Sequence, residues 1–296
     1  MKLTQIRHLV AVADGGGLGP AAAASGVSRQ VLLRSIREIE QELGTALFRH
    51  GDRPAALTPA GEMFVRRAAA ALADLGRATD EIHQTSGSSG GLVSLGLSAD
   101  AHHPASAGVL AAFRARFGDI RLRIVEGSFE ALGREVRDGV LDFYIGQVWL
   151  DRPTDGLKID RLHDVARSIV VRPGHPLAGA TSLAELGQAR WIASSRCELD
   201  AVFGKAGLPR PRIETEAGTG LGMLSAVAAS DAALIVSASW LPLIERTGLA
   251  TALPLEVPLD ALPIHVATRT RLPLTPAAAY LKALIVQASS SVRPLA

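Results

Sequence analysis

The sequence has few of the features that mark secreted or membrane proteins. Its 296 residues include one cysteine, Cys197, so no disulfide can form within the chain, and the absence of disulfides fits a reducing compartment. No apolar run approaches the roughly 20 residues that span a bilayer. The first fifteen residues carry Lys2, Arg7 and Asp14 in place of an uninterrupted signal-peptide core. We therefore expect a cytoplasmic protein with no membrane partner.

The chain also has little net charge. Its formal charge is +2, so no strong overall field draws it to DNA, and any DNA affinity must come from a local surface. Hydrophobic residues make up 48% of the chain, which is enough to bury substantial cores in two or three domains. Composition therefore indicates a globular, multidomain protein.

The clearest pattern lies between Gly17 and Thr58 and predicts a helix-turn-helix followed by a β-hairpin wing. Ser28 is a good N-cap, and apolar residues follow it at helical spacing on a face that should be buried: Leu32, Ile36, Ile39 and Leu43. Basic and polar residues occupy another face, as expected of a helix that enters a DNA groove. The predicted DNA contacts, with two from the wing, are Ser28, Arg29, Gln30, Leu33, Arg34, Arg37, Arg49 and Arg53.

Two further helices should complete this domain. Gly19 can cap the second helix and Pro20 suits its first position, while Gly26 can take the positive φ that the following turn requires. Leu3, Ile6 and Leu9 mark an amphipathic first helix. The first fifty-eight residues are thus expected to form a winged helix-turn-helix domain, which is mostly helical.

A long helix is predicted over 59–86. Its apolar residues alternate in steps of four and three, which is an a/d seam: Gly61, Val65, Ala68, Leu72, Leu75, Thr79 and Ile82. A helix of this length extends about 40 Å, which is too long to bury the seam against one small domain. We expect it to pair with another subunit; the alternative is an intramolecular core helix.

The Gly- and Ser-rich residues 87–91 predict a flexible hinge, and residues 92–296 alternate strand-like and helical runs in the βαβ order of a parallel α/β sheet. A second set of such runs predicts two lobes joined by two crossings, near Asp164–Ser168 and His265–Arg269. We expect lobe I to hold 92–164 and 268–296, and lobe II to hold 165–267.

Several short motifs resemble those of the LysR-type transcriptional regulators: Ala21-Ala22, Val27-Ser28, Ile39-Glu40-Gln41-Glu42-Leu43-Gly44, Leu47-Phe48 and Leu57-Thr58-Pro59-Ala60-Gly61. The likeness covers the whole chain. It implies an effector-binding domain similar to type 2 periplasmic solute-binding proteins, a double-stranded DNA operator and a small-molecule effector. It also implies a homodimer or homotetramer, with RNA polymerase as a candidate partner.

Three positions depart from the pattern of that family. Gly19, Leu33 and His50 replace residues that commonly contact DNA in it. Either the operator is unusual, with Leu33 packing on a thymine methyl and Arg29 reading guanine or phosphate, or DNA binding is weak. A two-lobed ligand-binding protein that has lost specific DNA binding is therefore an alternative function.

In open α/β sheets, ligands bind beyond the carboxyl ends of the strands, where helix N-termini favour anions. Small and hydroxyl side chains at these ends predict a small anionic or aromatic effector. The candidate effector residues are Ser98, Ala99, Asp100, His102, Gly127, Ser128, Gln147, Ser194, Ser195, Arg196, Gly218 and Thr219. Serine and threonine at helix starts are also ordinary caps, and Ser98, Ser128 and Thr219 are the favoured contacts.

No catalytic residue, metal or cofactor is predicted. His102 and His103 are adjacent, with no further ligand at metal-binding spacing. Ser98, Asp100 and His102 could suggest an enzyme, but no motif orients them. The sequence leaves open the effector, the target genes, activation or repression, and dimer or tetramer.

Overall fold

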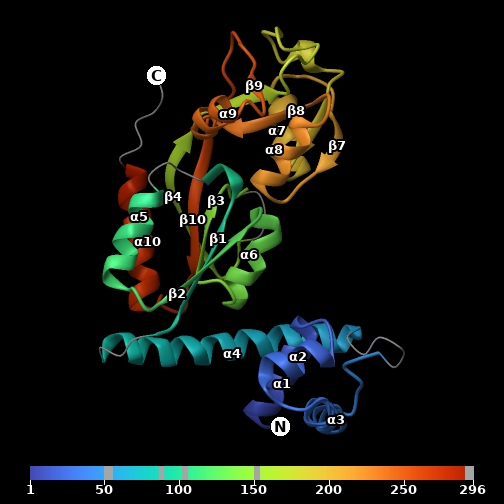
Figure 1. Ribbon diagram of the computed structural model, residues 1–296, viewed down its shortest axis with the longest axis vertical. Helices are drawn as coiled ribbons and strands as arrows, with labels where there is room; N and C mark the ends of the chain where they lie inside the picture. Colours follow the sequence, from blue (N-terminus) through green and yellow to red (C-terminus); the bar gives the residue numbers. More distant parts are fainter. Residues whose placement is uncertain (50–55, 87–89, 102–105, 150–153, 291–296) are drawn as a thin grey trace. The chain divides into compact units, whose positions relative to one another are not determined.

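The computed structural model describes residues 1–49, 56–86, 90–101, 106–149 and 154–290 (Figure 1). The predictions for His50, Arg53, His102 and His103 lie outside these residues. Two compact units divide the chain: Met1–Ile82 with Asp138–Val140, and His83–Arg137 with Leu141–Ala296. The N-terminal unit and the C-terminal unit are described in turn.

The N-terminal unit contains the predicted helix-turn-helix. Helices α1 (Leu3–Asp14), α2 (Leu18–Ser25) and α3 (Arg29–Leu43) follow one another. The Ser28 hydroxyl caps α3 by accepting the Val31 N–H at 3.3 Å, and Gly26 adopts a left-handed φ of 66° in the turn. Helix α2 begins before Pro20 because Gly16 and Gly17, both at positive φ, turn the chain early.

Three residues of the expected apolar face of α3 are buried in the core of this unit: Leu32, Ile36 and Ile39. They pack with Leu9 of α1 and Ala21 of α2. Leu43 differs from the prediction, since it is 40% exposed. It is the last residue of α3, and the chain turns away from the helix at Gly44.

The wing is tied to α3 by one carboxylate. Oε1 of Glu40 accepts the N–H groups of Leu47 at 2.7 Å and Phe48 at 3.1 Å, and Phe48 forms an antiparallel bridge with Leu57. Thr58 then begins the next helix, because its hydroxyl accepts the Gly61 N–H at 3.0 Å and donates to the Ala46 carbonyl at 2.7 Å. The positions of α3, wing and α4 thus depend on one another.

Helix α4 (Pro59–Thr85) divides its seam between two environments. Gly61, Val65 and Ala68 are buried in the core of the N-terminal unit, so the intramolecular alternative accounts for the first half. Leu75 and Ile82 are 50% and 65% exposed. The second half of the seam is therefore less buried than the first half.

The first sheet of the C-terminal unit has the order β2-β1-β3-β10-β4. Its strands are β1 (Leu92–Leu97), β2 (Arg121–Glu126), β3 (Phe143–Gly146), β4 (Leu157–Val165) and β10 (Leu262–Arg269). The first three run parallel, and β10 is antiparallel to β3 and β4. Helices α5 (Ser106–Arg116) and α10 (Pro276–Ser290) cover one face and α6 (Phe129–Asp138) the other (Figure 1).

The second sheet has the order β7-β6-β8-β5-β9. Its strands are β5 (Arg167–Val171), β6 (Arg190–Ala193), β7 (Arg212–Glu216), β8 (Ala232–Ser237) and β9 (Thr251–Ala252). Helices α7 (Arg196–Lys205), α8 (Gly220–Ala228) and α9 (Leu241–Thr247) belong to this lobe, as do the short turns η2 (Ala184–Leu186) and η3 (Ala238–Trp240). Trp191 and Phe203 meet edge to face in its core, at a centroid distance of 5.3 Å.

The lobe boundary expected at residues 267 and 268 is corrected by the sheets. Strand β10 already belongs to the first sheet from Leu262 onward, where Ile264 and Val266 enter the first core. The second crossing therefore precedes Leu262. Strand β4 was not predicted, because its many charged residues, such as Lys158 and Asp160, hide the strand pattern.

Packing at Gly61 gives a matched pair of substitutions in α4. A Cβ at Gly61 would overlap the carbonyl of Leu47, whereas a Cβ at Gly76 meets open space. We predict that Gly61→Ala lowers the unfolding free energy of the N-terminal unit by about 1–3 kcal/mol. Gly76→Ala should leave it unchanged or raise it by up to about 1 kcal/mol. Urea denaturation followed by circular dichroism would measure both, and equal stability of the two variants would contradict the packing.

Candidate functional site

The predicted DNA-binding face of α3 is exposed in the N-terminal unit. Arg29, Gln30, Arg34 and Arg37 are exposed, and Leu33 is half-buried. The hydroxyl of Ser28 is engaged in capping, so its first role is to position the helix. On the wing, exposed Arg49 donates from Nε to the Leu57 carbonyl at 3.2 Å.

The arginines of α3 differ in how their charge is compensated. Nε of Arg34 pairs with Oε1 of Glu38 at 2.7 Å, which raises the pKa of Arg34 and lowers that of Glu38. Within the described residues, no carboxylate pairs with Arg29 or Arg37. The guanidinium of Arg29 lies over Gly19, where an added Cβ would be 3.0 Å from Nη2. Gly19 thus leaves room for Arg29 beside α2.

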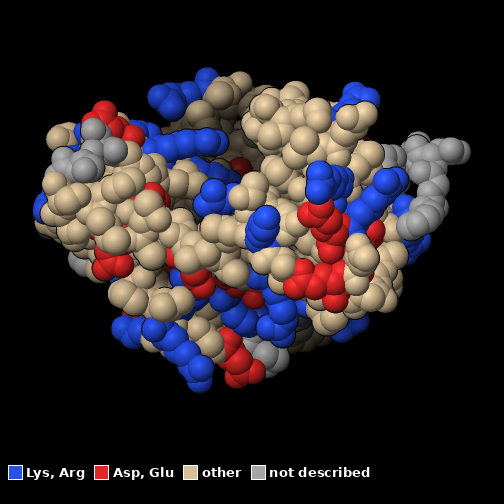
Figure 2. Space-filling model, turned by 90° about the horizontal axis from the view of Figure 1, so that it is seen from below, with Lys and Arg blue, Asp and Glu red and all other residues tan. Residues whose placement is uncertain are grey.

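Figure 2 shows lysine and arginine interspersed with acidic side chains on the face seen from below. Cationic character is therefore distributed in local groups rather than in one continuous field, as the net charge of +2 leads one to expect. Unpaired Arg29 and Arg37 are such a local group on α3.

A pocket in the C-terminal unit, here called the strand-end pocket, collects most of the predicted effector residues. Its lining includes Ser98, Ala99, Asp100, Gly127, Ser128, Gln147, Ser194, Ser195 and Gly218. Two predicted residues do not line it. Thr219 instead caps α8, accepting the Gly222 N–H at 3.2 Å, and Arg196 is exposed at the start of α7.

Four further residues line the strand-end pocket and were not predicted: Phe129, Glu130, Tyr144 and Trp149. Phe129 and Glu130 begin α6 directly after Ser128, so their position in the first helical turn could have indicated them. Tyr144 lies within β3 and gave no such signal. Its hydroxyl and the Ser98 hydroxyl both lie beside Gly146, where an added Cβ would be 2.5 Å from each oxygen.

Direct contacts between the lobes close this pocket. Glu126 at the end of β2 accepts the Gly220 N–H, which begins α8, at 2.6 Å. Nε1 of Trp240 donates to the Ala99 carbonyl, in the short turn η1 (Ala99–Ala101), at 3.2 Å. The cavity that remains has a volume of about 20 Å³, enough for about one water molecule. A ligand larger than this needs a wider pocket than the structure shows.

Two carboxyl groups share one guanidinium beside the pocket. Nη1 of Arg167 lies 3.4 Å from Oε1 of Glu198, and their side chains are 7% and 10% exposed. Burial raises the pKa of Glu198 to about 8; the Asp100 carboxylate adds to this rise and Arg167 opposes it. Burial likewise raises the pKa of Asp100 to about 6. The region thus contains more buried carboxyl groups than basic ones.

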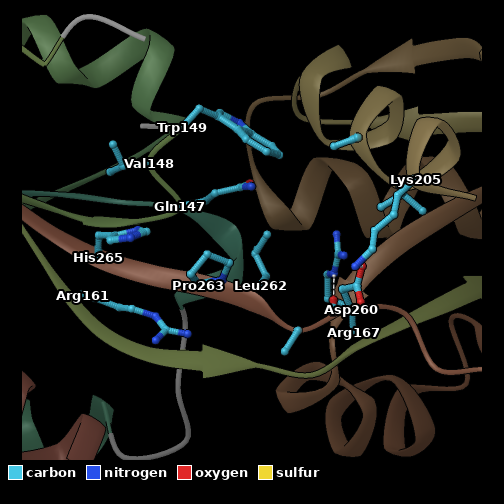
Figure 3. Close-up of a pocket in the computed structure, with 13 residues that line it drawn as sticks. Gln147, Val148, Trp149, Arg161, Arg167, Lys205, Asp260, Leu262, Pro263 and His265 are labelled. Carbon is cyan, nitrogen blue, oxygen red and sulfur yellow. Dashed lines mark hydrogen bonds and ion pairs between the residues drawn. The ribbon is translucent and has the colours of Figure 1, made fainter. Parts of the chain in front are cut away.

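A roomier pocket, here called the hinge-side pocket, lies next to the crossings and has a volume of about 470 Å³ (Figure 3). Its basic residues are Arg161, Arg167 and Lys205, and Nζ of Lys205 pairs with Asp260 Oδ2 at 2.6 Å. Burial and the charge of Arg161 lower the pKa of His265, which lies with Arg161 on the opposite side from that ion pair. Gln147 and Trp149 line both pockets.

Other kinds of site find little support in the part of the chain that the structure describes. No group of three or more His, Cys, Asp or Glu side chains there is placed to hold a metal ion. No described helix combines the length and the apolar character needed to cross a bilayer. Cys197 is half-buried in the first turn of α7.

Comparison with known proteins matches both units. Residues 3–62 match the family of bacterial regulatory helix-turn-helix proteins of the lysR type, and residues 86–290 match the LysR substrate binding domain. The transcriptional regulator GbpR of Azospirillum brasilense is 24% identical over 98% of this chain and 87% of its own length.

Solved structures share the fold along the chain. CbnR, a LysR family transcriptional regulator, superposes with a TM-score of 0.73 at 20% identity, covering 99% of this chain and 100% of CbnR. Full-length CbnR in complex with its target DNA gives a TM-score of 0.69 at 20% identity, covering 98% of this chain and 100% of CbnR.

The raised pKa of Glu198 predicts how stability changes with pH. Its pKa of about 8 lies above the ordinary 4.5, so the folded state binds the proton more tightly and loses stability as pH rises through this window. In Glu198→Gln, the fall in unfolding free energy between pH 6 and 8.5 should be smaller by at least about 1 kcal/mol.

Thermal unfolding at the two pH values would measure this difference. Glu245→Gln is the control, because Glu245 is exposed on α9 and should keep the wild-type fall. An unchanged fall in Glu198→Gln would show that the buried carboxyl does not govern the pH response.

Proposed function

The chain belongs to the LysR family of DNA-binding transcriptional regulators, and we propose that it regulates transcription by coupling a ligand in the strand-end pocket to operator binding by α3. The observation that carries this proposal is the α3 surface. Helix α3 is held by the Ser28 cap and the Glu40–wing contacts, and it presents Arg29 and Arg37 without carboxylate partners among the described residues. Such a helix suits the major groove of DNA.

Double-stranded DNA is the proposed partner of this surface. CbnR, which shares the fold, has been solved with its target DNA. Arg29 and Arg37 can donate to guanine or to phosphate oxygens, and half-buried Leu33 can contact a thymine methyl. This arrangement favours an operator that offers a guanine or phosphate to the arginines and a thymine methyl to Leu33. It is preferred to the alternative that DNA binding has been lost.

The strand-end pocket is the proposed effector site, formed by both lobes of the domain that matches the LysR substrate binding domain. Ligand binding must break or reshape the Glu126–Gly220 and Trp240–Ala99 contacts, which join the lobes. Any difference in ligand affinity between the open and closed lobes shifts their populations. We propose that this shift changes the geometry with which the DNA-binding units meet the operator.

A homodimer or homotetramer would bury the exposed apolar side chains in the second half of α4. Leu75 and Ile82 continue the seam that is buried at Val65 and Ala68, yet half or more of each side chain is exposed. Pairing of this segment between two copies would bury them and bring two α3 helices to two half-sites. We also propose RNA polymerase as a partner of the DNA-bound protein.

We propose that the protein is cytoplasmic and that it catalyses no reaction. Regulation requires only binding and a change of population. The enzyme alternative needs a convergent acid, base or nucleophile. Three polar groups near the pocket already have other roles: Thr219 caps a helix, Glu126 joins the lobes and Arg167 pairs with Glu198.

Substitution of the exposed, unpaired arginines of α3 should weaken DNA binding without disturbing the fold. We predict that Arg29→Ala and Arg37→Ala weaken operator binding, by about 1–3 kcal/mol for a base contact or with a salt slope reduced by about one for a phosphate contact. The probe is a labelled fragment from upstream of the protein's own coding region, titrated by fluorescence anisotropy at two salt concentrations with unrelated DNA as competitor.

The matched control is Arg246→Ala, which removes an exposed arginine of α9 in the C-terminal unit and should bind as wild type does. Wild-type affinity and sequence preference in both α3 variants would remove these arginines from the interface. Wild-type binding no better than to the competitor would refute operator recognition itself.

Charge introduced into the exposed seam should dissociate the oligomer. We predict that Leu75→Glu and Ile82→Glu reduce the mass measured by light scattering after size-exclusion chromatography, because each places a carboxylate in an apolar interface. Arg66→Glu is the control, since position 66 is exposed two and a half turns from Leu75, on the opposite side of α4. An unchanged mass for both seam variants would rule out pairing through this segment.

A further inference from the structure

We propose that the strand-end pocket binds a small organic cation with a flat or aromatic body, such as an amidinium, guanidinium or ammonium compound. This inference rests on the proposed function and specifies the effector. It differs from the anionic effector expected from helix N-termini alone, because the folded chain places its own carboxylates at those N-termini.

The helix starts near the pocket, which would attract an anion, already have carboxyl groups of the protein beside them. Glu126 accepts the N–H that opens α8, at 2.6 Å. Glu130 lies in the first turn of α6, and buried Glu198 in the first turn of α7. Glu126 thus satisfies the start of α8 directly, and the other two carboxyl groups lie where a helix start would otherwise favour an anion. An anionic ligand would therefore have to displace a carboxylate of the protein or lie against one.

The charged residues that line the strand-end pocket also disfavour an anionic ligand. Asp100 and Glu130 are its charged side chains, and neither Lys nor Arg is among the described residues that line it. The nearest basic partner, Arg167, already serves Glu198. A cation would supply the positive charge that the carboxyl groups of Asp100 and Glu130 lack, and at Asp100 it would take the place of a bound proton. A metal ion is less suited, since no described group of three ligands converges.

Two unsatisfied hydroxyl groups give an independent reason to expect N–H donors. Ser98 is 7% exposed and Tyr144 is fully buried, and neither side-chain oxygen completes a hydrogen bond of normal geometry to a described residue. Both line the pocket. Burial raises the pKa of Tyr144 further above its ordinary value, so it remains a neutral phenol. Its oxygen and that of Ser98 can accept hydrogen bonds from an amidinium or ammonium group.

Aromatic side chains complete the recognition. Phe129 and Tyr144 lie with their ring centroids 5.4 Å apart, and Trp149 also lines the pocket. The faces of such rings attract cations and stack on flat groups. By contrast, the hinge-side pocket contains Arg161, Arg167 and Lys205, which pair with Asp164, Glu198 and Asp260 in that order. These basic residues make it the less suitable of the two pockets for a cation.

The test compares three ligands of nearly the same shape. Benzamidinium, benzamide and benzoate are titrated into the full-length protein by calorimetry at pH 6 and pH 8. We expect benzamidinium to bind at least about tenfold more tightly than the other two, with affinity rising from pH 6 to pH 8 as the carboxyl groups ionise. Benzoate or benzamide binding equally or better would overturn the proposal, and so would the absence of binding by all three.

Substitutions locate the binding. Glu130→Gln and Asp100→Asn should each weaken benzamidinium binding by about fivefold or more. Two variants should bind as wild type does: Glu245→Gln, on the surface of α9, and Lys205→Gln, in the hinge-side pocket. Glu130 is exposed at the start of α6, so Glu130→Gln tests the site even if Asp100→Asn fails to fold. Wild-type affinity in Glu130→Gln, together with loss in Lys205→Gln, would move the ligand to the other pocket and refute the assignment.

Separate measurements distinguish a failure of this inference from a failure of the proposed function. Operator binding is measured without benzamidinium, so loss of specific DNA binding would refute the regulator while ligand selectivity still stood. Conversely, a preference for benzoate would refute the cationic effector and leave operator recognition intact.

Discussion

Arg167 joins the two lobes of the C-terminal unit at the points where the chain passes between them. It begins β5 directly after the first crossing, and its Nε donates to the Asp260 carbonyl, just before the second crossing, at 2.7 Å. Its Nη1 lies 3.4 Å from Glu198 in α7. One nearly buried guanidinium thus links both crossings to a helix at the pocket. Removing it would leave Glu198 and Asp100 buried without a cation, which is costly in a medium of low dielectric constant.

Polar contacts near the pocket also join the two lobes directly. Glu126 of the first lobe serves the N-terminus of α8 in the second, and Trp240 of the second lobe bonds to the Ala99 carbonyl of the first. Gly220 makes this possible, because a side chain there would overlap the Trp240 ring. The closed form is therefore stabilised by the protein's own groups. Under the proposed function, a ligand would have to offer more favourable contacts than these to change the population of open and closed lobes.

The N-terminal unit relies on an equally small set of polar contacts. Glu40 holds the wing against α3, and Thr58 connects the wing to the start of α4. Gly61 lets α4 approach the Leu47 carbonyl. The orientation of Arg29 and Arg37 is consequently coupled, through α3, to the direction in which α4 leaves the unit. Under the proposed pairing of α4 between copies, this coupling would link the pairing to the spacing of the DNA-binding helices.

Local patterns in the sequence determined the helix-turn-helix, its Ser28 cap, the left-handed turn at Gly26, the long helix α4 and the alternation of strands and helices, because these depend on residues a few positions apart. They also placed Ser98, Ser128 and Gln147 at strand ends that meet in one pocket.

Only the tertiary structure decided the charge of that pocket, the roles of Tyr144 and Trp149, the position of β4 and the residue at which the chain returns to the first lobe. The Glu126–Gly220 and Trp240–Ala99 bonds join residues 94 and 141 positions apart. Contacts over such distances leave no periodic signal, since either partner alone resembles an ordinary surface carboxylate, glycine or core aromatic residue.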